Sequence, residues 1–584
     1  MRGFFKHLAT HFPTFDKKYH LLAIATILIF SIGFFLSFYR LADIPNGLYP
    51  DETAIGYNAY SILQTGKDEY GVSYPLYFRS FDDYKMPVYI YSTTLAIKVF
   101  GVNAFAVRFM SALFGWLGII ALYFLIIALS KNKYLALIAS LFLTLNPWHV
   151  FFSRVGYEVN VATSLLVIGT LFFVIAVNKK NNFFLFFISI VSFILSLYTY
   201  NVTRLIAPLL FLTLVWFYYK KITITSKKLL TTLGILFFIG MLPFLITLVS
   251  LQSQPGFASQ QDALITGKVA KVDILQTRSY FTSLPSIVQK VFFNYWVLVI
   301  WQFFSNLISF LSTVFFFTKG PEHPYENIQG FGMFYFFDLP FILLGIYQGI
   351  KKRIVYLYPF YIWLFFILIV SGVVVPFLDT YGTKTYEISI PLIIFSAFGF
   401  YSFIKMLTHI KNYLLKSGII IIVLICIAFS YLFYFTSYFV RFPVEQAKEW
   451  HAEDQQTVAY IRSNENKYNT IIFDDSSHFL YTYLLFYGQY PPQLHQQQAV
   501  YVPDGLVDTV IKDGKYEFRK IDWSKDLAKA GTLIITGKDN VPSNRAPLAV
   551  FNYPTRPVVI YYNRNIAQYP TTDTAYEIFQ SGNE

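Results

Sequence analysis

Long apolar runs separated by short basic connections constrain this chain more than any other feature. A helix that crosses a bilayer needs about 20 apolar residues. Because 55% of the 584 residues are hydrophobic and only 14% are charged, well below the roughly 25% of soluble domains, the sequence predicts a polytopic α-helical membrane protein. Eleven spans are expected, at about 21–39, 107–129, 134–152, 159–177, 183–199, 205–219, 229–250, 331–350, 354–377, 386–404 and 417–438.

Basic residues cluster in the N-terminal segment and in every second connection. Examples are the pairs at 179–180 and 220–221 and the triplet at 351–353, whereas the opposite short loops hold few cations. By the positive-inside rule, the N-terminus is expected in the cytoplasm and the C-terminal region outside a plasma membrane. The net charge of +13 is therefore interpreted as a topology signal among membrane lipids, and no nucleic-acid partner is expected.

The predicted membrane domain, residues 1–439, contains two long outer loops. Loop 40–106 includes a short apolar helix, Val88 to Phe100, which is expected to lie in the membrane interface. Loop 251–330 includes the apolar stretch from Val291 to Thr318. If that stretch crossed, every later basic loop would face outward, so we expect a re-entrant or interfacial segment.

The composition changes near residue 440, where charged residues return. Short β-rich runs at 470–473, 532–535 and 558–561 alternate with helical stretches. This pattern predicts a small extracytoplasmic α/β domain over 440–584. Because it has no phosphate-binding glycine loop and no metal-type Cys or His spacing, we expect it to be accessory.

Two adjacent carboxylates, Asp51 and Glu52, follow Pro50 in the first outer loop. A helix is predicted from this point to Gly66. One interpretation is that Asp51 caps the helix while Glu52 complements its dipole. The other interpretation is catalytic, and the choice depends on the remaining polar residues.

Polar residues outside the basic clusters gather in the outer connections. The cations among them could simply reach the headgroups, His149 could belong to an interfacial aromatic belt, and a solvated acid pair could be neutralised by Lys85. Their concentration on one face nevertheless favours an enzyme over a transporter, whose polar groups would lie at midplane. The residues concerned are Asp82, Asp83, Lys85, Arg108, His149, Arg154, Glu158, Tyr200, Asn201, Arg204, His323 and Lys384.

Several segments resemble membrane glycosyltransferases of the GT-C superfamily, and specifically the protein O-mannosyltransferase and aminoarabinose transferase group. They are Pro50-Asp51-Glu52 with its helix, the segment 83–91 that contains Lys85-Met86-Pro87, and 105–115 at the start of the second span. Segments around Arg154, around Arg204 and at 327–345 resemble later landmarks of bacterial members. The resemblance implies the GT-C fold.

The resemblance also implies roles for individual residues. Asp51 corresponds to the catalytic base, with Glu52 beside it. Donor-phosphate ligands would be Arg108, Arg154, Arg204 and Lys384, although many bacterial members have a His and an Arg where this chain has Thr380 to Lys384. Asp82, Asp83, Lys85, His149, Glu158, Tyr200 and Asn201 are candidates for the sugar or acceptor site. No cofactor is assigned, and a divalent metal ion is left open, with Asp83 and His323 as candidate ligands.

These roles describe a transferase acting on a polyprenyl-phosphate sugar. Asp51 would take the proton of an acceptor hydroxyl as that oxygen attacks the anomeric carbon, with inversion, and cations would stabilise the departing phosphate. The acceptor could be a protein, a lipid or a glycan of the cell envelope. The alternatives are a flippase or transporter of lipid-linked glycans, and a membrane anchor for the C-terminal domain.

Overall fold

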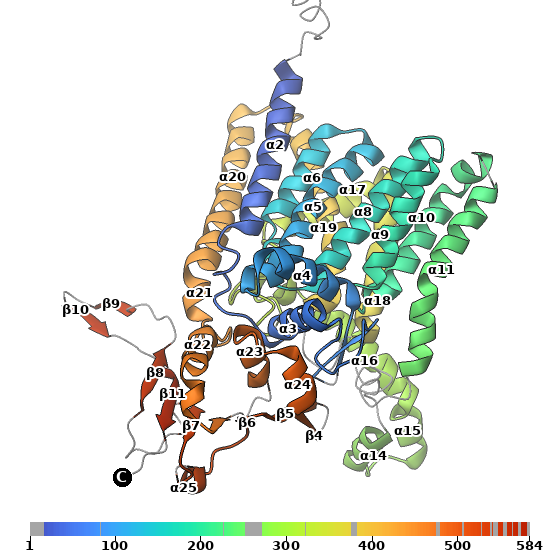
Figure 1. Cartoon of the computed structure of the whole chain (residues 1–584). Helices are drawn as coiled ribbons and strands as arrows, with labels where there is room; N and C mark the ends of the chain where they lie inside the picture. Colours follow the sequence, from blue (N-terminus) through green and yellow to red (C-terminus); the bar gives the residue numbers. More distant parts are fainter. Residues whose placement is uncertain are drawn as a thin grey trace, which may run out of the picture.

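The computed structural model describes residues 17–81, 83–225, 227–251, 271–321, 323–374, 382–474, 479–504, 507–526, 528–537, 540, 547–552, 558–562, 565–569 and 574–580. A bundle of long helices lies against a smaller C-terminal region of helices and strands (Figure 1). The bundle helices are α2 (Lys17–Phe38), α5 (Ala104–Ser130), α6 (Lys133–Leu145), α7 (Pro147–Ser153), α8 (Glu158–Asn178), α9 (Phe183–Leu197), α10 (Thr203–Thr225), α11 (Lys227–Leu251), α16 (Tyr295–Phe310), α17 (Asp338–Lys351), α18 (Tyr358–Val374), α19 (Ser389–Leu407) and α20 (Tyr413–Thr436).

Each of the eleven predicted spans corresponds to a helix or a bent helix pair, which confirms the predicted helical membrane fold, although some of these helices are short. Among the described residues, nine helices are long and apolar enough to cross a membrane, or ten if the bent pair α6 and α7 counts as one span. Helices α9 and α17 have only 15 and 14 residues, about 22 and 21 Å at 1.5 Å per residue. The break between α6 and α7, 61° at Pro147, arises because proline cannot continue the hydrogen bonding of a preceding helix.

The segment Tyr295–Thr318 is one of those nine helices, although the charge pattern predicts that it does not cross. It consists of α16 and the short π-helix η1 (Val314–Thr318), and α16 packs against α18. Two further helices precede it, α14 (Lys271–Tyr280) and α15 (Ser286–Phe292). Its length permits a crossing, and its re-entrant or interfacial placement stays a prediction.

Two shorter helices, α3 (Pro50–Thr65) and α4 (Pro87–Phe100), lie across one end of the bundle (Figure 1). Helix α3 ends at Gly66, whose φ of +69° suits glycine. The two helices pack against each other through a small core that includes Ile55, Ile90 and Ala106. Between them, β1 (Phe78–Ser80) and β2 (Asp83–Lys85) form an antiparallel hairpin.

The C-terminal region contains a mixed sheet, as an α/β domain requires. Seven strands are ordered β4-β5-β6-β3-β7-β11-β8, with β3 parallel to β6 and β7 and the other pairs antiparallel. The strands are β3 (Thr470–Phe473), β4 (Ala499–Asp504), β5 (Val507–Asp513), β6 (Tyr516–Phe518), β7 (Thr532–Thr536), β8 (Ala549–Asn552) and β11 (Thr574–Gln580), with β9 (Val558–Tyr562) and β10 (Asn565–Tyr569) as a separate hairpin. The helices of this region are α21 (Phe442–Glu445), α22 (Asp454–Asn464), α23 (Leu480–Tyr487), α24 (Pro492–Gln498) and α25 (Trp523–Asp526), with the short 3-10 helix η5 (Glu465–Lys467). In the bundle, η2 (Val355–Leu357) precedes α18, η3 (Thr383–Ile388) precedes α19 and η4 (Ser437–Arg441) follows α20.

Helix α3 and the C-terminal region share one hydrophobic core. Tyr57 of α3 is buried in the same cluster as Phe486 of α23, and the hydroxyls of Thr53 and Thr482 are 2.8 Å apart. Gly56 permits this approach, because a Cβ there would lie 2.3 Å from the Phe486 ring. The C-terminal region is therefore packed directly on the helix that carries the acid pair.

Candidate active site

The two adjacent acids of α3 have different environments. The side chain of Glu52 is fully buried and forms an ion pair with the equally buried Arg108 of α5 (2.8 Å). Glu52 accepts four hydrogen bonds, two from the Arg108 guanidinium (2.8 and 2.9 Å), one from Gly156 N (2.8 Å) and one from Tyr49 N (3.4 Å). Because these bonds join the start of α3 to α5 and to the segment before α8, Glu52 fixes the start of α3 in place.

Arg108 uses every N–H group of its guanidinium within the protein. Besides the two bonds to Glu52, it donates to the carbonyl oxygens of Leu41 (3.2 Å), Pro45 (2.9 Å) and Gly47. A guanidinium has five N–H donors, so none remains for a donor phosphate. The sequence predicts a phosphate ligand here, whereas the contacts indicate a structural residue that holds the loop before α3.

Asp51 points away from this buried network. The helix begins at Pro50 with Tyr49 as its N-cap, so the expectation that Asp51 is the cap is wrong, and Asp51 lies in the first turn. Its carboxylate is 41% exposed and contacts Nζ of Lys85 at 2.8 Å. The positive end of the helix dipole and the Lys85 ammonium therefore both lie beside an accessible carboxylate.

Tyrosines and further acids surround Asp51. The ring of Tyr49 lies 5.5 Å from that of Tyr157 and 5.4 Å from that of Tyr325. Burial, followed by the charges of Glu449 and Asp51, raises the pKa of Tyr325 to about 12. Tyr325 therefore stays a neutral hydrogen-bonding group near Asp51 at physiological pH.

The other predicted phosphate ligands differ in environment. Arg154 is buried and donates to the carbonyl oxygens of Leu36 (2.6 Å), Tyr39 (2.7 Å) and Ile44 (3.1 Å), so it also has a structural position. Arg204 is half-buried on α10, contacts Sδ of Met86 and lies 5.1 Å from the Tyr77 ring centre. Since Met86 directly follows Lys85, Arg204 is close to the residue that pairs with Asp51.

Lys384 is half-buried beside Glu326, whose carboxylate joins two loops. Glu326 accepts hydrogen bonds from Gly382 N and from the Thr383 hydroxyl (2.6 Å). Its pKa is raised to about 7 because burial outweighs these hydrogen bonds. Sequence reasoning did not assign Glu326 to the site, although an acid in an outer loop rich in aromatic residues is a usable signal.

His149 belongs to a polar chain inside the bundle rather than to the region around Asp51. Its Nδ1 is 2.9 Å from the hydroxyl of Tyr386, which donates to Asn160 Oδ1 at 3.1 Å. Asn160 in turn donates to Ser111 O at 2.8 Å. Each residue in this series is hydrogen-bonded to the next, so the series links α7, η3, α8 and α5.

Glu387, which sequence reasoning missed, is fully buried beside this chain, and among the described residues neither of its carboxylate oxygens has a hydrogen-bond partner. An acidic residue at the start of a predicted span was the available signal. Its charge contributes, after burial, to raising the pKa of Tyr200. Glu158, in the first turn of α8, and Tyr200 and Asn201, between α9 and α10, are all half-buried.

The expected metal ligands fall partly outside the described residues, so their role stays a prediction. Asp82 and the side chain of Asp83 lie outside the described residues. His323 packs against Tyr325, with ring centres 5.3 Å apart. Within the described part of the chain, the one group of three potential metal ligands is His451, Glu453 and Asp454, and it does not include His323.

Comparison with known proteins places this architecture. A family model described as dolichyl-phosphate-mannose-protein mannosyltransferase matches residues 84–246, a range that begins after Asp51 and Glu52. The structure of ArnT from Cupriavidus metallidurans bound to undecaprenyl phosphate is similar, with a TM-score of 0.54 at 13% identity over 95% of this chain and 97% of that chain. Its apo structure gives 0.52 at 12% identity over 90% and 94%.

The oligosaccharyltransferase AglB from Archaeoglobus fulgidus, in complex with an inhibitory peptide and a dolichol-phosphate, gives a TM-score of 0.46 at 13% identity over 81% of this chain and 64% of that chain. No curated protein matches the chain. The protein is thus a multi-pass membrane protein with the GT-C fold. The predicted resemblance to the mannosyltransferase and ArnT-like group is confirmed.

Proposed function

We propose that this protein transfers a glycosyl group from a polyprenyl-phosphate donor to an acceptor hydroxyl at the outer face of the plasma membrane. In this orientation, the N-terminus is cytoplasmic, and α3, α4 and the C-terminal domain are outside, as the basic connections favour. The fold shared with ArnT, whose structure holds undecaprenyl phosphate, supports a lipid phosphate as the leaving group.

The observation that carries the proposal is the difference in burial and contacts between Asp51 and Glu52. Glu52 is locked by Arg108, whereas Asp51 presents a partly exposed carboxylate. Asp51 accepts the proton of the acceptor hydroxyl as its oxygen bonds to the anomeric carbon, and the bond from that carbon to the phosphate oxygen breaks. A single displacement of this kind inverts the anomeric centre, and every step uses only side chains of this chain.

Lys85 and Arg204 are the cations best placed for the departing phosphate. Lys85 contacts Asp51 directly, and Arg204 contacts the adjacent Met86. Positive charge at this point offsets the negative charge that develops on the leaving phosphate.

The test uses purified protein, radiolabelled polyprenyl-phosphate hexose and a panel of hydroxyl acceptors. Asp51→Asn should abolish transfer, while Asp43→Asn, which changes an exposed acid paired with Arg40, should leave transfer intact. Undiminished transfer by Asp51→Asn would remove Asp51 from its role. Movement of the lipid between leaflets without transfer would favour the flippase.

A further inference from the structure

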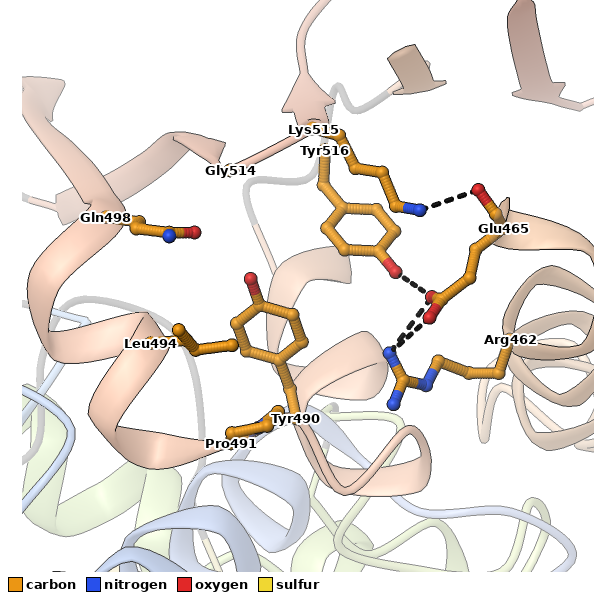
Figure 2. Close-up of a pocket in the computed structure, with 9 residues that line it drawn as sticks. All are labelled: Arg462, Glu465, Tyr490, Pro491, Leu494, Gln498, Gly514, Lys515 and Tyr516. Atoms are coloured by element: carbon orange, nitrogen blue, oxygen red, sulfur yellow. Dashed lines mark hydrogen bonds and ion pairs between the residues drawn. The ribbon is translucent and has the colours of Figure 1, made fainter. Parts of the chain in front are cut away.

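A cavity of about 380 Å³ in the C-terminal domain lies outside the site described above. Figure 2 shows side chains from three elements facing it, with Tyr490 before α24, Gln498 at the end of α24, and Lys515 at the turn between β5 and β6. Its volume is within the roughly 300–1,000 Å³ typical of small-ligand sites. The cavity is therefore large enough for a small ligand or one unit of a larger one.

The cavity carries a net positive charge. Arg462 Nη1 donates to both oxygens of Glu465 (3.0 and 2.9 Å), which also accept the Tyr516 hydroxyl. Lys515 Nζ instead donates to the Glu465 carbonyl oxygen at 2.6 Å. Among the described residues, no carboxylate lies within ion-pair distance of Lys515, so its charge is available to a ligand.

The walls combine apolar faces with polar edges. The rings of Tyr490 and Tyr516 lie 5.8 Å apart at 82°, and Leu494 adds an aliphatic surface. The exposed Gln498 supplies an amide close to Gly514, where a Cβ would lie 2.8 Å from the Gln498 Oε1. Such a site suits a pyranose ring, which packs its C–H face on tyrosine and places hydroxyl groups at the polar edge.

The cavity shape disfavours a peptide. Extended peptides are recognised along sheet edges, and helical peptides along apolar grooves. Here, a helix end, a loop and a hairpin turn line a local, partly open pocket (Figure 2). A single saccharide unit with an acidic group fits this arrangement better than a run of residues.

Residues at and next to the cavity are hydrogen-bonded to α3 and to the loop after it. The Tyr490 carbonyl accepts the hydroxyl of Tyr57 (3.3 Å), and Gln496 of α24 donates to Asp68 O (2.8 Å) just after α3. Tyr57 is six residues from Asp51, about 9 Å along the helix. The cavity and Asp51 therefore belong to elements that are packed directly on each other.

We propose that this cavity binds a carboxylate- or phosphate-bearing saccharide unit of the acceptor. The acidic group contacts Lys515, the ring packs on Tyr490, and Gln498 donates to a hydroxyl. That the saccharide belongs to the acceptor rests on the proposed function, whereas its binding to the cavity does not. The C-terminal domain is then a recognition module rather than an accessory.

The test is isothermal titration of the full-length protein in detergent, without donor, using a hyaluronan tetrasaccharide and its carboxyl-reduced neutral form. The acidic form should bind and the neutral form should bind at least fivefold more weakly. Lys515→Gln should weaken binding roughly tenfold, as expected for a lost charge-assisted hydrogen bond, and Gln498→Ala roughly threefold. Lys512→Gln is the matched control, since it changes an exposed lysine near Glu517 outside the cavity, and should change binding less than twofold.

Several outcomes would overturn the proposal. They are no binding of either saccharide, equal binding of both, equal weakening by Lys512→Gln, or tighter binding of hexaglutamate with the same loss in Lys515→Gln. Asp51→Asn should bind the acidic saccharide as the wild type does. If the wild type binds the acidic saccharide but transfers no sugar, only the proposed chemistry is contradicted. If it transfers sugar but does not bind the saccharide, only this binding site is contradicted.

Discussion

Replacement of Glu52 by glutamine tests whether Glu52 has a structural role while Asp51 is the general base. Glu52→Gln keeps the side-chain shape but leaves the Arg108 charge without its only ionic partner in the described structure, where both side chains are fully buried. Breaking one side of a buried ion pair costs about 3–5 kcal/mol, a large part of the roughly 5–15 kcal/mol that stabilises typical domains. The protein should therefore unfold at a clearly lower temperature.

Thermal unfolding in detergent micelles measures this effect. The control is Glu445→Gln, which breaks an exposed pair with Arg441 (2.9 Å) and should cost only about 0.3–0.5 kcal/mol. The double variant Glu52→Gln/Arg108→Met should lose less stability than the two single variants added together, because the stranded charge is gone. If Glu52 were the proton acceptor, Glu52→Gln would be inactive but as stable as the wild type, and that result would refute the reasoning.

Three further predictions concern charge, pH and packing. Arg204→Gln should raise the KM for the lipid donor and lower kcat/KM roughly tenfold or more without lowering the unfolding temperature. The control is Arg353→Gln, in a basic connection, and an equal loss of kcat/KM in that variant would contradict a specific role for Arg204. The pKa of Glu326 is about 7 in the folded protein, against an ordinary value of 4.5. Between these two pH values the folded protein binds one more proton than the unfolded chain, so the free energy of unfolding falls by about 1.4 kcal/mol per pH unit as the pH rises. Unfolding scans at pH 5 and 8 should show this fall in the wild type and not in Glu326→Gln. Gly56→Ala should loosen the C-terminal domain, seen as faster proteolysis there, because its Cβ would lie 2.3 Å from Phe486; unchanged proteolysis would contradict that packing.

The sequence was sufficient for the helices and for the location of the acids, because both depend on local signals. Apolar length predicted the bundle, and Pro50 and Gly66 set the bounds of α3. It was insufficient for the lengths of two helices, because non-helical backbone occupies 198–202 and 331–337, so that α9 ends at Leu197 and α17 begins at Asp338. A helical stretch runs from Tyr413 to Glu445, and the domain boundary near residue 440 stays a prediction.

Roles that depend on distant partners could not be read from the sequence. Arg108 and Arg204 are both arginines near the ends of predicted spans, yet one is surrounded by carbonyls of the loop 41–47 and the other lies beside Met86. Which of Asp51 and Glu52 is buried depends on Arg108, 56 residues along the chain. Packing of the C-terminal domain on Gly56 has no local signal at all.

The most direct test of the account is single-turnover transfer from a labelled polyprenyl-phosphate sugar by wild type and Asp51→Asn at saturating donor. The account predicts a rate at least a hundredfold lower for the variant, as expected for loss of a general base, with donor affinity and unfolding temperature unchanged. Transfer at the wild-type rate by a correctly folded Asp51→Asn protein would contradict the account.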